Sequence, residues 1–178
     1  MLTAMRDITL FSLDKAAATL LASDPSAFAE RYEMALAPHE PIAVAIATET
    51  AGILAAGGAR APWGGYFALE GSARRVVGAG GFKGEPDGQR AVEIAYFTFP
   101  GDEGRGVASA LAAALVEIAR AAEDEVALVR AHTLPEHNAS CRILEKLEFQ
   151  HIGAVIDPED GPVWRWEREI IERTAPAV

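Results

Sequence analysis

The chain has 178 residues, of which half are hydrophobic and 24% are charged. This is enough apolar material for one domain with a sizeable core, and it excludes an intrinsically disordered chain. The net charge of −10 opposes binding to nucleic-acid phosphates, so we expect no nucleic-acid partner. The same charge is compatible with a cationic substrate, although many proteins are acidic for solubility alone.

Neither a membrane span nor a secretion signal is evident in the chain. The most apolar stretch, "PIAVAIATETAGILAAGG", contains Glu49 and two threonines and ends in glycines, which favours a buried or amphipathic helix. The N-terminus has no basic segment followed by a long apolar one. Cys141 is the only cysteine, so no internal disulfide can form. We therefore expect a cytoplasmic protein with no membrane partner.

The N-terminal third reads as one strand followed by helices. The strand is expected over 7–13, and two helices follow in "DKAAATLLAS" and "DPSAFAERYEMAL". The second of these opens with Asp24 as a cap and Pro25 in its first turn. Pro38 and Pro41 are expected to break the chain before an apolar helix that ends near Gly57.

The remaining chain alternates between strands and helices. Three strands in an antiparallel meander are predicted in "YFALEG", "RRVVGAGGFKG" and "AVEIAYFTF", separated by turn residues. A helix follows with Leu111, Leu115 and Ile118 on one face, then a strand in "EVALVRAH" and a helix in "NASCRILEKL". Two strands, "FQHIGAVID" and "VWRWERE", complete an α/β arrangement in one layered domain.

The segment "FPGDEGRGVASALAAAL" joins the third meander strand to the next helix. A strand ending at Phe99 and a helix beginning near Arg105 bring several unpaired backbone N–H groups to one point, where the helix dipole adds positive charge. Gly104 and Gly106 lack side chains that would block an anion, and Ala108 is small. The turn is therefore a candidate phosphate site.

Three phosphate-binding motifs are candidates for this turn. A P-loop requires a lysine and a Ser or Thr after its last glycine, and neither is present. A dinucleotide fingerprint requires a glycine where Ser109 stands and an acid at the end of the next strand, which ends in "AHTLP". The pyrophosphate of a cofactor such as coenzyme A remains. The turn alone is equally compatible with a plain helix start that binds nothing.

Three segments in order, "VEIAYFTFP", "GRGVASAL" and "TLPEHNASCRILEKLEF", together resemble the GNAT superfamily of acetyl-CoA-dependent N-acetyltransferases. The closest likeness is to the branch of the ribosomal-protein N-terminal acetyltransferases. The resemblance is strongest over 64–170, and it implies one N-acetyltransferase domain over 1–178 with a mixed, mostly antiparallel sheet of about seven strands. It implies direct transfer of an acetyl group from acetyl-CoA, without an acyl-enzyme, to a primary amine of a protein N-terminus or a small molecule.

The resemblance also implies a cofactor site. The backbone of Phe97, Thr98 and Phe99 would pair with the pantetheine arm, and His137 and Asn138 would flank the cofactor. The pyrophosphate would lie on the loop formed by Gly104, Arg105, Gly106, Val107, Ala108 and Ser109.

Four positions depart from the family pattern. His137 stands where the family often has asparagine. Glu103 stands where Gln or Arg is usual, and a carboxylate there is unfavourable beside a pyrophosphate unless it points away. Glu148 replaces a glycine before the last phenylalanine of the motif, and Leu144 replaces the usual tyrosine.

Two side chains are candidates for the chemistry. An alkyl ammonium has a pKa of roughly 10, so the acceptor amine needs a general base, and Glu93 lies among apolar residues of a strand. An exposed glutamate or a structural ion pair is the alternative for Glu93. By resemblance, Ser140 could protonate the leaving thiolate, although Asn138 and Ser140 are also suited to cap a helix.

The remaining nucleophilic and metal-ligating side chains indicate no further catalytic or metal site. Cys141 lacks a His–Asp partnership and is expected to be a structural thiol. The four histidines have no metal-ligand spacing, so no metal is expected. A non-catalytic acyl-CoA-binding or regulatory module is the alternative to an enzyme, and a purely structural domain is a third.

The acetyl acceptor is not identified by any motif. Four acids in the N-terminal helices and the last hairpin would suit a cationic amine, although solvated surface is the default for each: Glu30, Glu33, Glu159 and Asp160. A homodimer through the terminal strands is an arrangement that the sequence permits.

Overall fold

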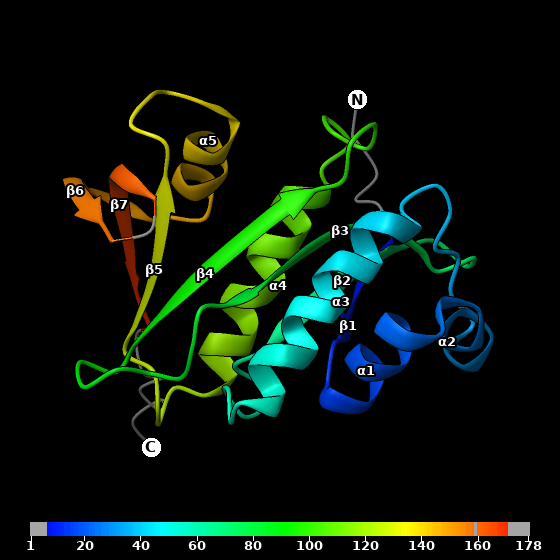
Figure 1. The fold of residues 1–178 in the computed structure, drawn as a ribbon. Helices are drawn as coiled ribbons and strands as arrows, with labels where there is room; N and C mark the ends of the chain where they lie inside the picture. The colour runs from blue at the N-terminus through cyan, green and yellow to red at the C-terminus, as the bar shows by residue number, and fades with distance from the viewer. Residues whose placement is uncertain (1–6, 159, 171–178) are drawn as a thin grey trace, which may run out of the picture.

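The computed structural model describes residues 7–158 and 160–170, and within them one seven-stranded sheet forms the centre of the molecule (Figure 1). Its strand order is β1-β2-β3-β4-β5-β7-β6. The strands are β1 (Ile8–Ser12), β2 (Gly65–Glu70), β3 (Arg75–Phe82), β4 (Ala91–Thr98), β5 (Leu128–Thr133), β6 (Gln150–Asp157) and β7 (Gly161–Glu169). The pairs are antiparallel except for β4 and β5, which are parallel. The expected mixed, mostly antiparallel sheet of about seven strands is confirmed.

Five helices surround this sheet, and local signals in the sequence set their starts. They are α1 (Lys15–Ser23), α2 (Pro25–Tyr32), α3 (Glu40–Ala55), α4 (Val107–Ala121) and α5 (Ala139–Lys146). Asp14 and Asp24 cap α1 and α2 by accepting hydrogen bonds from backbone N–H groups three residues later. Pro41 does not precede α3 but lies within its first turn, where a missing N–H is tolerated.

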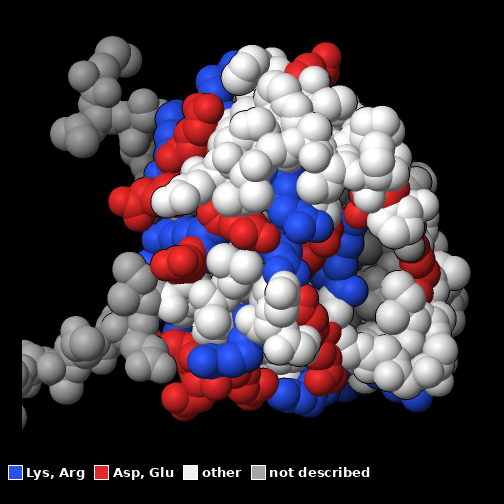
Figure 2. All heavy atoms as spheres, turned by 90° about the vertical axis from the view of Figure 1, so that its left-hand side faces the viewer, with Lys and Arg blue, Asp and Glu red and all other residues white. Residues whose placement is uncertain are grey.

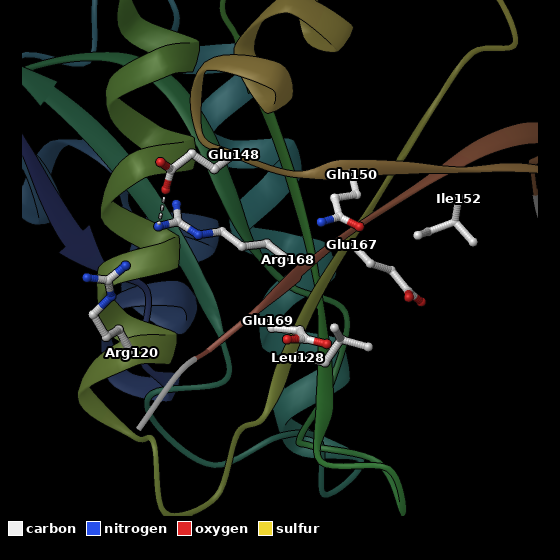
Figure 3. Close-up of a pocket in the computed structure, with 8 residues that line it drawn as sticks. All are labelled: Arg120, Leu128, Glu148, Gln150, Ile152, Glu167, Arg168 and Glu169. Carbon is white, nitrogen blue, oxygen red and sulfur yellow. Dashed lines mark hydrogen bonds and ion pairs between the residues drawn. The ribbon is translucent and has the colours of Figure 1, made fainter. Parts of the chain in front are cut away.

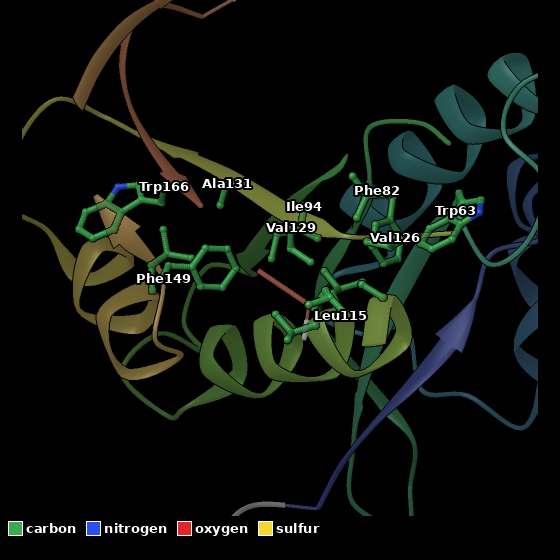
Figure 4. Close-up of a cluster of buried hydrophobic side chains, with 14 of the residues drawn as sticks. Trp63, Phe82, Ile94, Leu115, Val126, Val129, Ala131, Phe149 and Trp166 are labelled. Carbon is green, nitrogen blue, oxygen red and sulfur yellow. The ribbon is translucent and has the colours of Figure 1, made fainter. Parts of the chain in front are cut away.

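The helices form a layer on each face of the sheet. The α1–α3 layer packs on one face through a cluster that includes Phe28, Phe67 and Phe99. On the other face, Leu111 of α4 packs against Val77. Figure 4 shows the larger cluster on this side, in which Leu115 lies beneath β4 and β5. Full burial of one such leucine contributes roughly 1.5–3 kcal/mol, so both layers hold the sheet firmly.

The parallel pair β4 and β5 separates part-way along its length, as Figure 1 shows. Its register runs from Ala91↔Leu128 to Ile94↔Ala131, whereas β4 continues to Thr98. Beyond Ala131, β5 stays paired with β7 as far as Thr133↔Trp164. The two central strands therefore diverge at the end of β4 that leads into the glycine turn.

The surface charge is mixed on the side where β5, β6 and β7 lie. Figure 2 shows acidic and basic side chains interspersed on this face. Arg130, for example, pairs with Asp87 at 2.8 Å and with Glu167 at 3.0 Å. None of the five described helices has both the length and the apolarity that crossing a bilayer requires.

Candidate active site

The glycine turn before α4 is open toward solvent at the positions where an anion would bind. Gly104 and Gly106 have φ angles of +71° and +85°, which side-chain-bearing residues rarely adopt. A Cβ added at either position would meet no atom within 4 Å. Gly106 is the N-cap of α4 and no side chain in the described part of the chain caps this end. The loop therefore fits the pyrophosphate of coenzyme A, held on backbone amides.

A buried acid holds this turn from below. Asp102 is 3% exposed and accepts a bidentate hydrogen bond from Arg75 of β3 at 2.8 Å, and its Oδ2 lies 2.9 Å from His39 Nε2. The hydrogen bond from Arg75 keeps the pKa of Asp102 well below its usual range, although burial opposes this. Arg105 binds Asp102 and also Glu70 of β2. The turn is thus tied to α3, β2 and β3.

Glu103, the residue that departs from the family pattern, points back into its own turn. Its carboxylate accepts a hydrogen bond of 2.6 Å from the Gly101 N–H. This contact uses one carboxylate oxygen, but Glu103 also lines the cavity in front of the turn, so its negative charge opposes an anion bound there.

A cavity of about 560 Å³ extends from the glycine turn to the point where β4 and β5 diverge. We call it the donor cavity. Of the residues assigned to the cofactor by sequence, seven line it: Phe97, Thr98, Gly104, Gly106, Val107, Ala108 and Ser109. Ser140, Arg142 and Lys146 of α5 form the opposite wall. The two cations, which the sequence analysis did not single out, suit the phosphates of a coenzyme.

Four residues assigned to the cofactor lie outside the lining of the donor cavity. Phe99 is fully buried and its N–H donates to Val77 O at 2.9 Å, while Arg105 is directed at Asp102 and Glu70. His137 packs edge-on against Trp164. Asn138 caps α5 by accepting the Cys141 N–H at 3.1 Å. Their positions favour support of the site over direct contact with a ligand.

The backbone of β4 offers hydrogen-bonding groups to the donor cavity. The Phe99 N–H is directed at β3, and Glu93 O accepts from Lys83 N–H of the β3 side. Because backbone groups alternate along a strand, those of Tyr96 and Thr98 face the opposite way, toward the gap beside β5. Thr98, rather than Phe97 or Phe99, is thus the predicted residue whose backbone can pair with an extended pantetheine chain.

A second cavity, of about 480 Å³, lies on the other face of β4 beneath α3. We call it the acceptor cavity. Ile46, Thr50 and Ile53 of α3 line it, and it shares Tyr96 and Phe97 with the donor cavity. The two cavities therefore meet at β4 where the central strands separate.

Glu93 lies on the α3 side of β4, next to the acceptor cavity. Its Oε1 lies 2.9 Å from Lys83 Nζ and accepts a hydrogen bond from His132 Nδ1 at 3.2 Å. His132 Nδ1 is also 3.7 Å from Asp157 Oδ2. Both contacts of Glu93 in the described part of the chain use Oε1, which leaves Oε2 for an amine or a bridging water. Sequence reasoning missed Lys83, which directly follows β3, and His132, which lies on β5.

Lys83 carries a stable positive charge at this site. Burial lowers its pKa, but the hydrogen bond and the charge of Glu93, together with Asp157 and Asp160, outweigh burial and raise it. Of the three described acids that were expected near the acceptor, Asp160 is the one that lies at this site, at 3.6 Å from Lys83 Nζ. Glu30 and Glu33 do not line the acceptor cavity, and Glu159 lies outside the described residues.

The α5 side contains the phenol of Tyr96. Within the described residues, the Tyr96 hydroxyl is buried without a hydrogen-bond partner, and burial, aided by the nearby Cys141, raises its pKa. Tyr96 is therefore a neutral donor beside both cavities. Leu144, which stands where the family usually has tyrosine, is fully buried, as is the thiol of Cys141. No group of three described His, Cys, Asp or Glu side chains could hold a metal ion.

A third cavity, of about 490 Å³, shares no residue with the other two (Figure 3). It lies along β5 and β7, and both acids and bases line it, with Arg168 paired to Glu148 at 3.4 Å. Its charges are mixed and it is remote from the glycine turn, so it is not a candidate for acetyl transfer.

The central strands diverge beside a glycine turn at a helix N-terminus, and two cavities meet at β4. This arrangement is typical of a protein that brings a coenzyme A thioester to a second substrate. The sequence matches the model of the acetyltransferase (GNAT) domain over residues 7–150. The chain therefore belongs to the GNAT family of acetyl-CoA-dependent N-acetyltransferases, as the three motifs predicted.

Solved structures with the same fold are distant in sequence. The putative acetyltransferase yncA from Salmonella typhimurium, solved with its cofactor acetyl-CoA, is 16% identical with a TM-score of 0.59, covering 96% of this chain and 98% of that one. A spermidine N-acetyltransferase SpeG chimera from Vibrio cholerae and hSSAT is 13% identical with a TM-score of 0.64, covering 92% and 95%.

The ribosomal-protein-S5-alanine acetyltransferase from Vibrio fischeri is also similar in structure. It is 11% identical with a TM-score of 0.64, covering 94% of this chain and 96% of that one. Among curated proteins, no sequence matches the chain. At these identities, the solved structures support the fold and leave the acceptor to be inferred from the cavity itself.

Proposed function

We propose that this protein acetylates a primary amine, carried by a small molecule or a protein N-terminus, by direct attack within a ternary complex. The observation that supports this most strongly is the meeting of the donor and acceptor cavities at Tyr96 and Phe97. An amine that enters beneath α3 reaches β4 from one face while the coenzyme lies along it from the other. Holding two reactants in this way converts a bimolecular step into an effectively unimolecular one.

The roles of the protein groups follow from their positions around this point. When bound, acetyl-CoA supplies an activated acetyl thioester. Glu93 Oε2 accepts the proton of the amine, directly or through a water, while Lys83 and His132 hold Oε1 in place. Ser140, on the wall of the donor cavity, would donate its hydroxyl proton to the departing thiolate and regain a proton from solvent.

A screen of amines and N-terminal peptides for release of free coenzyme A tests this proposal. Ser140→Ala is expected to lower kcat by about 10²-fold or more if its proton transfer is general-acid catalysis. Asn138→Ala is the matched comparison, because it removes the cap of α5, at a cost of about 1 kcal/mol of stability, and retains the Ser140 hydroxyl. Equal loss of kcat in the two variants would argue against a catalytic Ser140.

The buried Leu144 favours one alternative, a module that binds acyl-CoA without turnover. Calorimetry with acetyl-CoA separates the two. Tight binding with no coenzyme A release from any amine would support the binding module, and absence of binding would contradict both functions.

A further inference from the structure

From the lining of the acceptor cavity, we infer that the acceptor is an amine on an apolar body, such as an alkylamine, an arylalkylamine or a peptide that begins with an apolar residue. This inference rests on the proposed function, since it names the substrate class of the same site. It distinguishes the apolar amine from a polyamine, whose several charges would have to lie in the same cavity.

The floor of the acceptor cavity is made of small side chains on the sheet. Gly81 is opposite Ala95, and Ala79 is opposite Phe97, so these four residues share one face of β3 and β4. Ala79 packs with the α1–α3 layer, which identifies this face as the one beneath α3. A Cβ added at Gly81 would lie 2.5 Å from Gly64 O, so glycine here lets the loop before β2 lie against the sheet and bound the cavity. Ala95 is exposed and small, and it leaves room for a ligand between the sheet and α3.

The roof and mouth of the cavity are apolar. Ile46, Thr50 and Ile53 have the spacing that places side chains on one face of a helix, and all three line the cavity. Ile53 and Phe97 are 55% and 48% exposed, which is unusual for large apolar side chains, and both border the cavity. An apolar ligand body would cover both of them and remove their exposed surface from water.

Few charges in the acceptor cavity are available to a polycation. Among the described lining residues, Glu49 and Lys83 are the only charged side chains, and Lys83 is already paired with Glu93. One amino group can approach Glu93, and the exposed Glu49 can receive a second. The remaining lining, which includes Ile46, Ile53 and Ala95, gives the third ammonium of spermidine no partner. A buried ammonium without a partner is strongly unfavourable, so the cavity opposes binding of spermidine.

The experiment measures kcat/KM for a series of n-alkylamines from propyl to hexyl, with 2-phenylethylamine and spermidine for comparison. Each added methylene is expected to raise kcat/KM about fourfold until the cavity is filled, which corresponds to about 0.8 kcal/mol per buried CH₂. Peptides that differ only in N-terminal Leu or Ser distinguish a peptide acceptor from a small one. A preference for spermidine, or no dependence on chain length, would overturn the inference.

A matched pair of variants tests the location of the apolar body. Ile53→Asp, at the mouth of the cavity, is expected to lower kcat/KM for hexylamine about tenfold and to leave the value for propylamine nearly unchanged. Ile152→Asp is the control, because Ile152 is similarly exposed, at 53%, but lies on β6 and does not line the acceptor cavity. Equal effects of the two substitutions would place the apolar body elsewhere and contradict the inference.

Binding measurements separate this inference from the proposed function. If no amine is acetylated, the proposed function fails, but calorimetry with hexylamine in the presence of coenzyme A still reports on the cavity. Binding that tightens with chain length and weakens in Ile53→Asp would support an apolar amine site. Equal or tighter binding of spermidine would overturn it.

Discussion

One oxygen of Glu93, Oε1, contacts both Lys83 and His132, although the three residues lie on different strands or strand ends. This arrangement makes the second oxygen, Oε2, the proton acceptor in the proposed reaction. Replacing Glu93 with glutamine retains a hydrogen-bond acceptor for both neighbours but removes the base. We therefore expect Glu93→Gln to lower kcat/KM by about 10²- to 10⁴-fold, with an unchanged dissociation constant for acetyl-CoA.

The measurement is coenzyme A release across a pH series, with calorimetry for acetyl-CoA binding. Glu117→Gln is a suitable control, because Glu117 is exposed on α4 and pairs only loosely with Arg120, at 3.8 Å. If Glu93→Gln stayed within twofold of the wild-type rate, Glu93 would be the structural ion pair that the sequence also allows.

Strand alternation was sufficient to select Glu93 from the sequence, but its partners were not accessible in this way. Alternation in "VEIAYFTF" separates Glu93, Ala95 and Phe97 from the core-facing residues, and the structure places them on the acceptor side. Lys83 and His132 meet Glu93 only through the pairing of β3 with β4 and of β4 with β5. A single sequence does not specify which residues lie opposite one another across strands.

At the end of α5, Glu148 departs from the family pattern, and this departure lowers the stability of the protein. Glu148 has a φ of +62°, in the left-handed region, and follows the C-cap residue Leu147. The Phe149 N–H donates to Leu144 O at 3.0 Å, which is the hydrogen bond of a Schellman motif. This motif favours glycine at position 148, which explains in physical terms why the family usually has glycine there.

We expect Glu148→Gly to raise the free energy of unfolding by about 0.5–1 kcal/mol, because glycine relieves the left-handed strain. The lost pair with Arg168 offsets little of this, since the Glu148 side chain is 84% exposed. Urea unfolding measures the change. Glu145→Gly, within the same helix, is the control and should destabilise the protein by about 1 kcal/mol. A destabilised Glu148→Gly variant would contradict the strain explanation.

At the scale of elements, the sequence predicted more than at the scale of contacts. Caps, prolines and hydrophobic periodicity located every described helix and strand to within a few residues, because these signals are local. The start of α4 shifted from near Arg105 to Val107, since two glycines in the left-handed region extend the turn. The acceptor cavity was not predictable, because it forms where α3 passes over small residues of distant strands.

At the scale of the whole molecule, Asp102 connects the coenzyme turn to the two layers that surround it. His39 at the start of α3, Arg75 of β3 and Arg105 of the turn all bind this one carboxylate. These contacts make Asp102 the buried anchor of the turn. No motif in the sequence indicates this role. The family resemblance located the turn, whereas the structure shows what holds it in place.

Asp102→Asn is expected to lower the free energy of unfolding by about 1.5–3 kcal/mol, because Arg75 loses one of its two carboxylate partners and keeps Glu70, at 2.6 Å. Since the turn loses its anchor, acetyl-CoA binding should weaken as well. Asp124→Asn, on an exposed turn, is the control and should change stability by less than about 0.5 kcal/mol. A destabilised variant with unchanged acetyl-CoA affinity would show that the anchor serves the fold alone.

The pH dependence of stability gives a second measurement of the same anchor. The folded-state pKa of Asp102 is lowered, first by the hydrogen bond from Arg75, whereas an unfolded aspartate titrates at about 3.9. Its contribution is therefore fully present above roughly pH 4 and is lost as the pH falls toward the folded-state pKa. Urea unfolding between pH 7 and pH 3 should show a shallower acid loss of stability in Asp102→Asn than in the wild type. Parallel curves would mean that other carboxylates carry the acid sensitivity, and that Asp102 does not link the coenzyme turn to the stability of the fold.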